Sequence, residues 1–186
     1  MKNSGSYTIW LETAYTLFAE EGPQNLSINS LAKKCLLPRT NFYYYFDDKD
    51  DLIDKLIRLH FETTTVLFNE ELRNRFHTYI PDLYVILLDF KLGLQFSTQL
   101  FRNSDKPKYN KAHKASVALS AEIILPKFKT FFKLDLPDKT VLSLWSTLVD
   151  AWYSRLNIDD LSVDSMISLC YEIMDSILPI VENKDQ

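Results

Sequence analysis

Apolar residues recur along most of this chain at intervals of three and four positions, the spacing that places side chains on one face of an α-helix. One stretch, 81–101, is apolar on nearly every side, as expected of a helix at the centre of a bundle. The pattern predicts helices at 8–21, at a short segment that begins after Ser27, and at 39–45, 49–75, 81–101, 110–133, 137–157 and 162–182. Because no segment shows the alternation typical of a strand, an all-α fold is predicted.

Turn and capping residues separate these segments. Gly22 and Pro23 end the first helix, and Ser27 can cap the next one. Asp47 or Asp48 can cap the long helix 49–75, and Ser162 can cap the last one. Short helices therefore fill residues 1–48 and long ones fill 49–186, so two domains with these bounds are predicted, bridged by the helix 49–75.

Composition narrows the function. The chain has 3 glycines in 186 residues and contains neither GxGxxG nor GxxxxGK[ST], which disfavours a nucleotide-binding α/β enzyme. The histidines His60, His77 and His113 have no paired metal spacing, and no Ser/His/Asp or paired-carboxylate arrangement stands out. We therefore expect no enzyme activity, metal or cofactor.

Two distant cysteines, Cys35 and Cys170, and a polar N-terminus are typical of a reduced cytoplasmic protein. The most apolar stretch, 83–94, is interrupted by Asp89 and Lys91 and is too short to span a membrane. A cytoplasmic protein without a membrane partner is expected.

Charge is unevenly distributed along the chain. The net charge is −4, yet residues 22–46 contain no acidic side chain and carry Lys33, Lys34 and Arg39. A locally positive segment in an acidic chain suits contact with phosphate groups, although three cations in such a window can also arise by chance.

This segment also has the parts of a helix-turn-helix: a short capped helix, a turn at 35–37 and a second short helix. In that motif the second helix enters the major groove of DNA. Phe42 and Phe46 share one face, which we place inward, while Arg39 suits guanine and Asn41 suits adenine. Tyrosine hydroxyls suit phosphate oxygens. The candidate DNA-binding residues are Ser27, Lys33, Arg39, Thr40, Asn41, Tyr43, Tyr44 and Lys49.

At these positions the chain resembles the N-terminal domain of the TetR family of bacterial transcriptional regulators. Residues 14–22 (AYTLFAEEG) look like the family's first helix, and Ser27 to Ala32 look like its second. Residues 41–46 (NFYYYF), followed by Lys49 and Leu52, match the family's recognition helix. The resemblance covers residues 8–58. The chain departs from the family at Leu36, Pro38 and Asn41, where Gly, Ser and Ser or Thr are usual.

The resemblance implies a ligand-responsive regulator, expected to be a repressor. As in the family, a homodimer would place two heads in successive major grooves of a pseudo-palindromic operator, and a ligand would stabilise a state whose head spacing no longer fits. In the family the last two helices pair with those of the partner as a four-helix bundle. The dimer-interface residues predicted on this basis are Leu148, Met166, Cys170, Ile173 and Ile177. The alternative is that these apolar stripes belong to the chain's own core.

The family places its ligand among the helices that correspond here to 49–75, 81–101, 110–133 and 137–157. Aromatic side chains are abundant there, and no cluster of acids or bases is evident, so a small, mostly apolar or aromatic ligand is predicted. The predicted wall residues are Phe68, Tyr84, Phe90, Trp145 and Trp152, with His60 or His113 as a polar anchor.

Two other functions remain open. A helical regulator could have lost operator binding and act through protein partners, as the acidic net charge and Leu36 suggest. A helical-bundle enzyme could use the aromatic interior.

Overall fold

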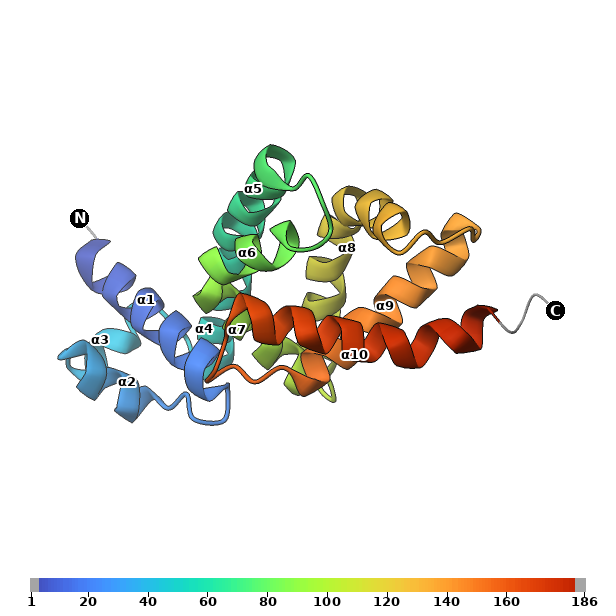
Figure 1. Ribbon diagram of the computed structural model, residues 1–186. Helices are drawn as coiled ribbons and strands as arrows, with labels where there is room; N and C mark the ends of the chain where they lie inside the picture. Colours follow the sequence, from blue (N-terminus) through green and yellow to red (C-terminus); the bar gives the residue numbers. More distant parts are fainter. Residues whose placement is uncertain (1–3, 183–186) are drawn as a thin grey trace.

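The computed structural model describes residues 4–182, and every regular element in that range is helical, which confirms the predicted all-α fold (Figure 1). The elements are α1 (Ser4–Glu21), α2 (Ile28–Cys35), α3 (Arg39–Phe42), α4 (Lys49–Leu59), the π-helical turn η1 (His60–Thr65), α5 (Val66–Arg75), α6 (Asp82–Asp89), α7 (Lys91–Arg102), α8 (Pro107–Phe131), α9 (Asp138–Arg155) and α10 (Val163–Glu182).

The capping residues predicted from the sequence are confirmed. The Ser27 hydroxyl accepts a hydrogen bond from the backbone N–H of Ser30 at 3.1 Å. Asp48 caps α4, because its carboxylate accepts from the N–H of Asp51 at 2.8 Å. Ser162 accepts from the N–H of Ser165 at 3.1 Å at the start of α10. Each cap satisfies a backbone donor that the first helical turn leaves unpaired.

The prediction of one uninterrupted helix over 49–75 is wrong, because a π-helical turn separates α4 from α5. Threonine hydroxyls donate hydrogen bonds to backbone carbonyls in this turn. Thr63 donates to Leu59 O at 2.6 Å, and Thr65 donates to His60 O at 3.2 Å. Such side-chain bonds compete with the regular helical pattern. The turn also faces α7 closely, since a Cβ on Gly93 would lie 2.3 Å from Thr64 Cγ2.

The single helix predicted over 81–101 is also two helices. Phe90, at φ −101° and ψ 35°, breaks it into α6 and α7, and its ring packs edge-on against Phe68 at 5.7 Å. The recognition helix is shorter than expected and ends at Phe42. The helix predicted from 110 begins at Pro107, whose fixed φ suits a first turn.

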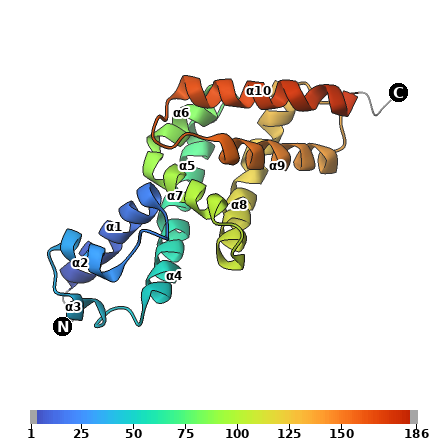
Figure 2. The ribbon, with the colours of Figure 1, turned by 90° about the horizontal axis from the view of Figure 1, so that it is seen from below.

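Two apolar cores organise the helices. The first joins α1, α2, α3 and α4 to one face of α7, and Phe96 from α7 lies fully buried within it. The second joins α6, α8, α9 and α10. Figure 2 shows α1, α2 and α3 projecting to one side, away from α9 and α10. We call residues 4–48 the head and the remainder the body; the functional division at residue 48 stays a prediction.

None of the helices within residues 4–182 has the length and apolar character needed to cross a lipid bilayer.

Candidate functional site

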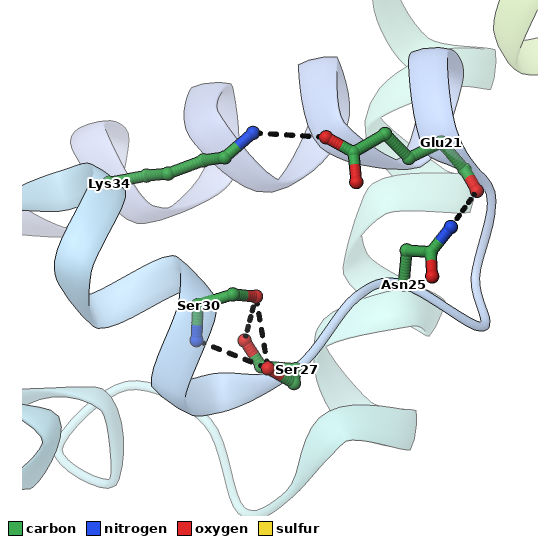
Figure 3. A network of polar contacts seen from close by, with 5 residues as sticks. All are labelled: Glu21, Asn25, Ser27, Ser30 and Lys34. Atoms are coloured by element: carbon green, nitrogen blue, oxygen red, sulfur yellow. Dashed lines mark hydrogen bonds and ion pairs between the residues drawn. The ribbon is translucent and has the colours of Figure 1, made fainter.

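Polar contacts fasten the second helix of the head to the first (Figure 3). Lys34 Nζ lies 3.1 Å from Glu21 Oε1, and the Asn25 side-chain amide donates to the Glu21 carbonyl at 2.9 Å. The Ser27 hydroxyl also donates to Ser30 Oγ at 3.0 Å. These contacts fix the position of α2 and, through the following turn, of α3.

The short helix α3 is anchored by one aromatic ring, while Arg39 and Thr40 on it and the two tyrosines that follow it are exposed. Phe42 is fully buried and meets the ring of Trp10 edge-on at 5.4 Å. Tyr43 and Tyr44 are half exposed or more, at 50% and 61%. Arg39 is exposed and donates from Nη2 to the Tyr43 hydroxyl at 3.0 Å. A cation and two phenols therefore face solvent together, with Thr40 exposed beside them.

Two of the predicted DNA-binding side chains are engaged inside the head. Trp10 Nε1 donates to Asn41 Oδ1 at 2.9 Å, so the amide oxygen that adenine recognition requires is occupied. The two-point adenine contact predicted for Asn41 is therefore not available in this conformation. Lys49 Nζ donates to the Pro23 carbonyl at 2.6 Å, and partial burial lowers the pKa of this amine.

The turn between α2 and α3 carries a strained, exposed leucine. Leu36 has φ 56° and ψ 35°, the left-handed region that glycine occupies without cost, and 90% of its surface is exposed. Ser27 is exposed at the start of α2, and Lys33 is exposed on the surface of the same helix. Lys33 is thus free to meet a phosphate, whereas the Ser27 hydroxyl is already used as a cap.

A cavity of about 110 Å³ lies in the body. Hydroxyls and an imidazole line one part of it, contributed by η1, α7 and α8: His60, Thr64, Thr65, Ser97, Ser116 and Ser120. Aromatic rings and aliphatic side chains line the rest, and the aromatic residues are Phe68, Tyr79, Tyr84, Phe90, Trp145, Trp152 and Tyr153. None of the lining residues is an Asp, Glu, Lys or Arg. Such a site suits an uncharged molecule with an apolar body.

Most polar groups of the cavity wall have partners within the chain. The Ser120 hydroxyl donates to Asn69 Oδ1 at 2.8 Å, and Trp152 Nε1 donates to the Met166 carbonyl at 3.1 Å. Trp145 differs, because its indole N–H is buried without a hydrogen-bond partner among the described residues. Burial raises the pKa of the Tyr79 hydroxyl, which also belongs to the cavity wall.

His60 connects the cavity with the head. Its Nδ1 lies 2.7 Å from the hydroxyl of Tyr15 on α1, and its Nε2 lies 3.2 Å from Ser97 Oγ on α7. The Tyr15 hydroxyl also lies 3.1 Å from Thr64 Oγ1. Burial lowers the pKa of His60 to about 4, so the imidazole is neutral at pH 7.

Comparison with known proteins shows which family and which regulators this chain is similar to. Residues 11–56 match the family model described as "Bacterial regulatory proteins, tetR family". A negative transcriptional regulator of a biofilm operon, IcaR of Staphylococcus aureus (strain Newman), is 22% identical over 155 residues, covering 78% of this chain and 81% of that protein. Residues 11–56 of this chain therefore belong to the TetR family. The chain is a DNA-binding transcriptional regulator, and TetR regulators bind DNA operators and are typically dimers.

Solved structures share the fold of this chain over nearly its full length. A transcriptional regulator from Saccharomonospora viridis, solved in complex with choline, has a TM-score of 0.62 at 20% identity, covering 93% of this chain and 97% of that one. A regulator from Aquifex aeolicus VF5 has a TM-score of 0.55 at 18% identity, covering 95% and 99%. At these identities the likeness concerns the fold.

The structure brings most of the predicted pocket residues to the cavity: His60, Phe68, Tyr84, Phe90, Trp145 and Trp152. His113 is the exception. Its ring packs against Phe101 and Tyr153, at 5.1 Å from each, and its Nε2 lies 3.4 Å from Asp150 Oδ1. Because Tyr153 itself lines the cavity, the His113 imidazole is held away from it, and His60 is the histidine that lines it.

Sequence reasoning missed the hydroxyl-bearing residues of the wall. A signal was present: Ser116 and Ser120 are four apart on α8, and the three consecutive threonines 63–65 interrupt a helical face. It also missed Tyr15, whose contact with His60 joins residues 45 positions apart.

The predicted dimer-interface residues are mostly internal to the protomer. Leu148, Met166, Cys170 and Ile173 are each at most 2% exposed and pack in the body core, so they cannot contact a second copy in this conformation. Their assignment to an interface is wrong, because an apolar stripe on a helix does not show which helix covers it. Ile177 is partly exposed, and Leu142 and Tyr171 are exposed on the outer faces of α9 and α10.

Proposed function

We propose that this chain represses transcription by binding a pseudo-palindromic operator as a homodimer, and that a small uncharged ligand in the body cavity releases it. The observation that carries the proposal is the surface of α3 and of the turn after it, where Arg39, Tyr43 and Tyr44 face solvent around the anchored ring of Phe42. A regulator of this kind would act in the cytoplasm, where bacterial DNA lies.

The exposed side chains of the head have complementary roles in the proposal. Arg39 can present two N–H groups to guanine O6 and N7 in the major groove. Tyr43 and Tyr44 can donate to phosphate oxygens and so fix the register of the helix on DNA. Lys49, at the start of α4, would add a cation at a helix N-terminus, a combination that favours phosphate, by exchanging the Pro23 carbonyl for a phosphate oxygen.

The cavity supports a neutral ligand with an aromatic or aliphatic body. A charged ligand would lose its hydration on entering the cavity, and no opposite charge in the wall would compensate for that loss. No lining residue is acidic or basic apart from the neutral His60. The size, about 110 Å³, suits a molecule built around a single ring.

A quaternary ammonium compound is a second candidate ligand. The structural relative from Saccharomonospora viridis was solved with choline, and the aromatic rings of this cavity could meet such a cation by cation–π contact. In this chain Tyr84 and Trp152 have ring centroids 6.1 Å apart. The lack of a carboxylate in the wall favours the neutral ligand.

We further propose that the outer faces of α9 and α10 form the dimer interface. Leu142, 43% exposed, and Tyr171, 41% exposed, are apolar or aromatic side chains on these faces, and the partly exposed Ile177 lies on the same helix as Tyr171. In a four-helix bundle made by two copies, such side chains would be buried against the partner.

The DNA-binding proposal is tested on an operator selected from random DNA by the purified protein. Arg39→Ala should weaken binding by about 1–3 kcal/mol and relax specificity at one position, because a guanine contact is lost. Lys49→Ala should weaken all sequences alike and reduce the salt slope by about one unit. Arg73→Ala, which removes an exposed arginine from α5, is the matched control and should bind as the original chain does.

Two results would favour the other functions. If the original chain selects no DNA sequence while remaining folded, the head would serve protein partners instead. If a compound that enters the cavity is chemically converted, the protein would be an enzyme that uses its aromatic interior. The match to the TetR family favours a regulator, because proteins of that family are in general regulators.

A further inference from the structure

His60 is a wall residue of the cavity that also contacts the first helix of the head. Its exposed fraction is 2%, and both of its ring nitrogens are engaged, Nδ1 with Tyr15 and Nε2 with Ser97. Tyr15 lies on α1, and Ser97 lies on α7 and also lines the cavity. One imidazole therefore stands between a head residue and a cavity residue.

The single proton of a neutral imidazole links these two bonds. One ring nitrogen carries the proton and donates, while the other accepts. If Tyr15 donates to Nδ1, then Nε2 donates to Ser97; if Ser97 donates to Nε2, then Nδ1 donates to Tyr15. A change of partner at Nε2 therefore alters what Nδ1 offers to Tyr15.

The surrounding packing leaves little room to absorb such a change locally. The ring of Phe96 stacks on Tyr15, Phe18 and His60, with centroid distances of 4.6, 4.3 and 4.7 Å. The backbone of α7 is also close to the imidazole, since a Cβ on Gly93 would lie 3.9 Å from His60 Cε1. A movement of His60 would therefore be transmitted through Phe96 to α1, which packs along α7.

We propose that His60 relays occupancy of the cavity to the head: an occupant that replaces Ser97 at Nε2 changes the bond between Nδ1 and Tyr15 and so changes the fixation of α1. The inference rests on the proposed function, because it concerns how the ligand site acts on DNA binding. It assigns His60 and Tyr15 as positioning residues, and it requires that the occupant carry a hydrogen-bonding group at the His60 end of the cavity.

The relay can be tested without knowing the ligand, by a double-mutant cycle on operator binding. Ser97→Ala removes the partner of Nε2 and leaves the head untouched, while Tyr15→Phe keeps the aromatic stack and removes only the hydroxyl. Ser97→Ala should weaken operator binding at least about threefold in the original chain and have little effect in Tyr15→Phe, because the two residues act through His60. Ser97→Thr, which keeps a hydroxyl, should restore the original affinity.

Tyr109→Phe is the matched control. Tyr109 also packs in the head core, with its ring 6.1 Å from Phe18, but it does not line the cavity. The effect of Ser97→Ala should be the same with and without Tyr109→Phe. Additive effects of Ser97→Ala and Tyr15→Phe would overturn the relay, whereas a chain that binds no DNA would overturn the proposed function.

A second measurement needs no DNA. The ¹⁵N chemical shifts of the His60 ring report which nitrogen carries the proton. Ser97→Ala should change the distribution of that proton, and the change should be smaller in Tyr15→Phe. Ring shifts that do not respond to Ser97→Ala would overturn the relay.

Discussion

At the scale of single residues, the neutral state of His60 gives the protein a defined dependence on pH. The pKa of this imidazole is about 4 in the folded chain, because burial disfavours the charged form, against an ordinary value of 6.5. The unfolded chain therefore binds the proton first as the pH falls. Stability contributed by neutral His60 is complete above pH 6.5 and is lost progressively between pH 6.5 and 4.

The first prediction follows from this linkage. Between pH 7 and 4, His60 should contribute a loss of about 3 kcal/mol to the free energy of unfolding. His60→Gln should remove that part of the pH dependence, as measured by urea unfolding at several pH values, while His77→Gln, which changes an exposed histidine, should leave it intact. An equal pH slope in His60→Gln and in the original chain would show that His60 does not titrate as described.

Residue positions that depend on the local helix were predictable, and those that depend on distant partners were not. The spacing of Phe42 and Phe46 correctly placed both rings inward. The bond from Trp10 to Asn41 joins residues 31 positions apart, and no local pattern announces it. The same holds for the placement of His60 between Tyr15 and Ser97.

At the scale of elements, helices and caps could be predicted because they are set by residues within one or two turns. The π-helical turn η1 and the break at Phe90 could not, because they accompany the close packing of Gly93 against Thr64 and of Phe90 against Phe68. The apolar stripes of α9 and α10 were visible in the sequence, but periodicity alone does not distinguish a protomer's own core from an interface.

The turn between α2 and α3 yields the second prediction. Leu36→Gly should stabilise the chain by up to about 1 kcal/mol, raising Tm by about 2–4 °C, because glycine adopts the left-handed conformation without a Cβ penalty. Lys133→Gly should behave similarly, since Lys133 has φ 53°. Leu119→Gly changes an exposed residue within α8 and should destabilise the chain. Thermal unfolding measures all three, and a lower Tm for Leu36→Gly would contradict the strain assigned to this turn.

The outer faces of α9 and α10 give the third prediction. Tyr171→Asp should produce a folded monomer that binds operator weakly, because a charge would be buried against the partner. Ile173→Asp should instead prevent folding, because Ile173 is 1% exposed in the protomer core. Leu119→Asp, at an exposed apolar residue of α8, should remain dimeric.

Sedimentation velocity at micromolar concentration, together with circular dichroism, separates these outcomes. An original chain that sediments as a monomer would contradict the dimer, and a dimeric Tyr171→Asp would place the interface elsewhere.

At the scale of the whole molecule, packed contacts join the head to the cavity of the body, whose lining comes mainly from the second core. The head presents α3 to solvent, the cavity lies in the body, and the contacts of α1 with α7 and of Tyr15 with His60 join them. An occupant that binds one arrangement of head and body better than the other shifts the molecule toward it by that difference in affinity. Ligand binding and operator binding should therefore oppose each other reciprocally.

Trp10 limits how this coupling can be observed. Tryptophan fluorescence reports on Trp145 and Trp152 in the cavity wall, but Trp10 contributes as well, and replacing it would remove its bond to Asn41 in the head. The cavity signal is better isolated as the difference between the original chain and Trp145→Phe.

The most direct test is a titration of labelled operator DNA, followed by fluorescence anisotropy, in the presence of a panel of small aromatic compounds that are neutral, quaternary ammonium or multiply charged. We expect a neutral compound to weaken operator binding at the same concentrations at which it changes the cavity tryptophan signal, and the operator to weaken binding of that compound by the same factor. Release only by multiply charged compounds, or no compound that changes both signals, would contradict this expectation.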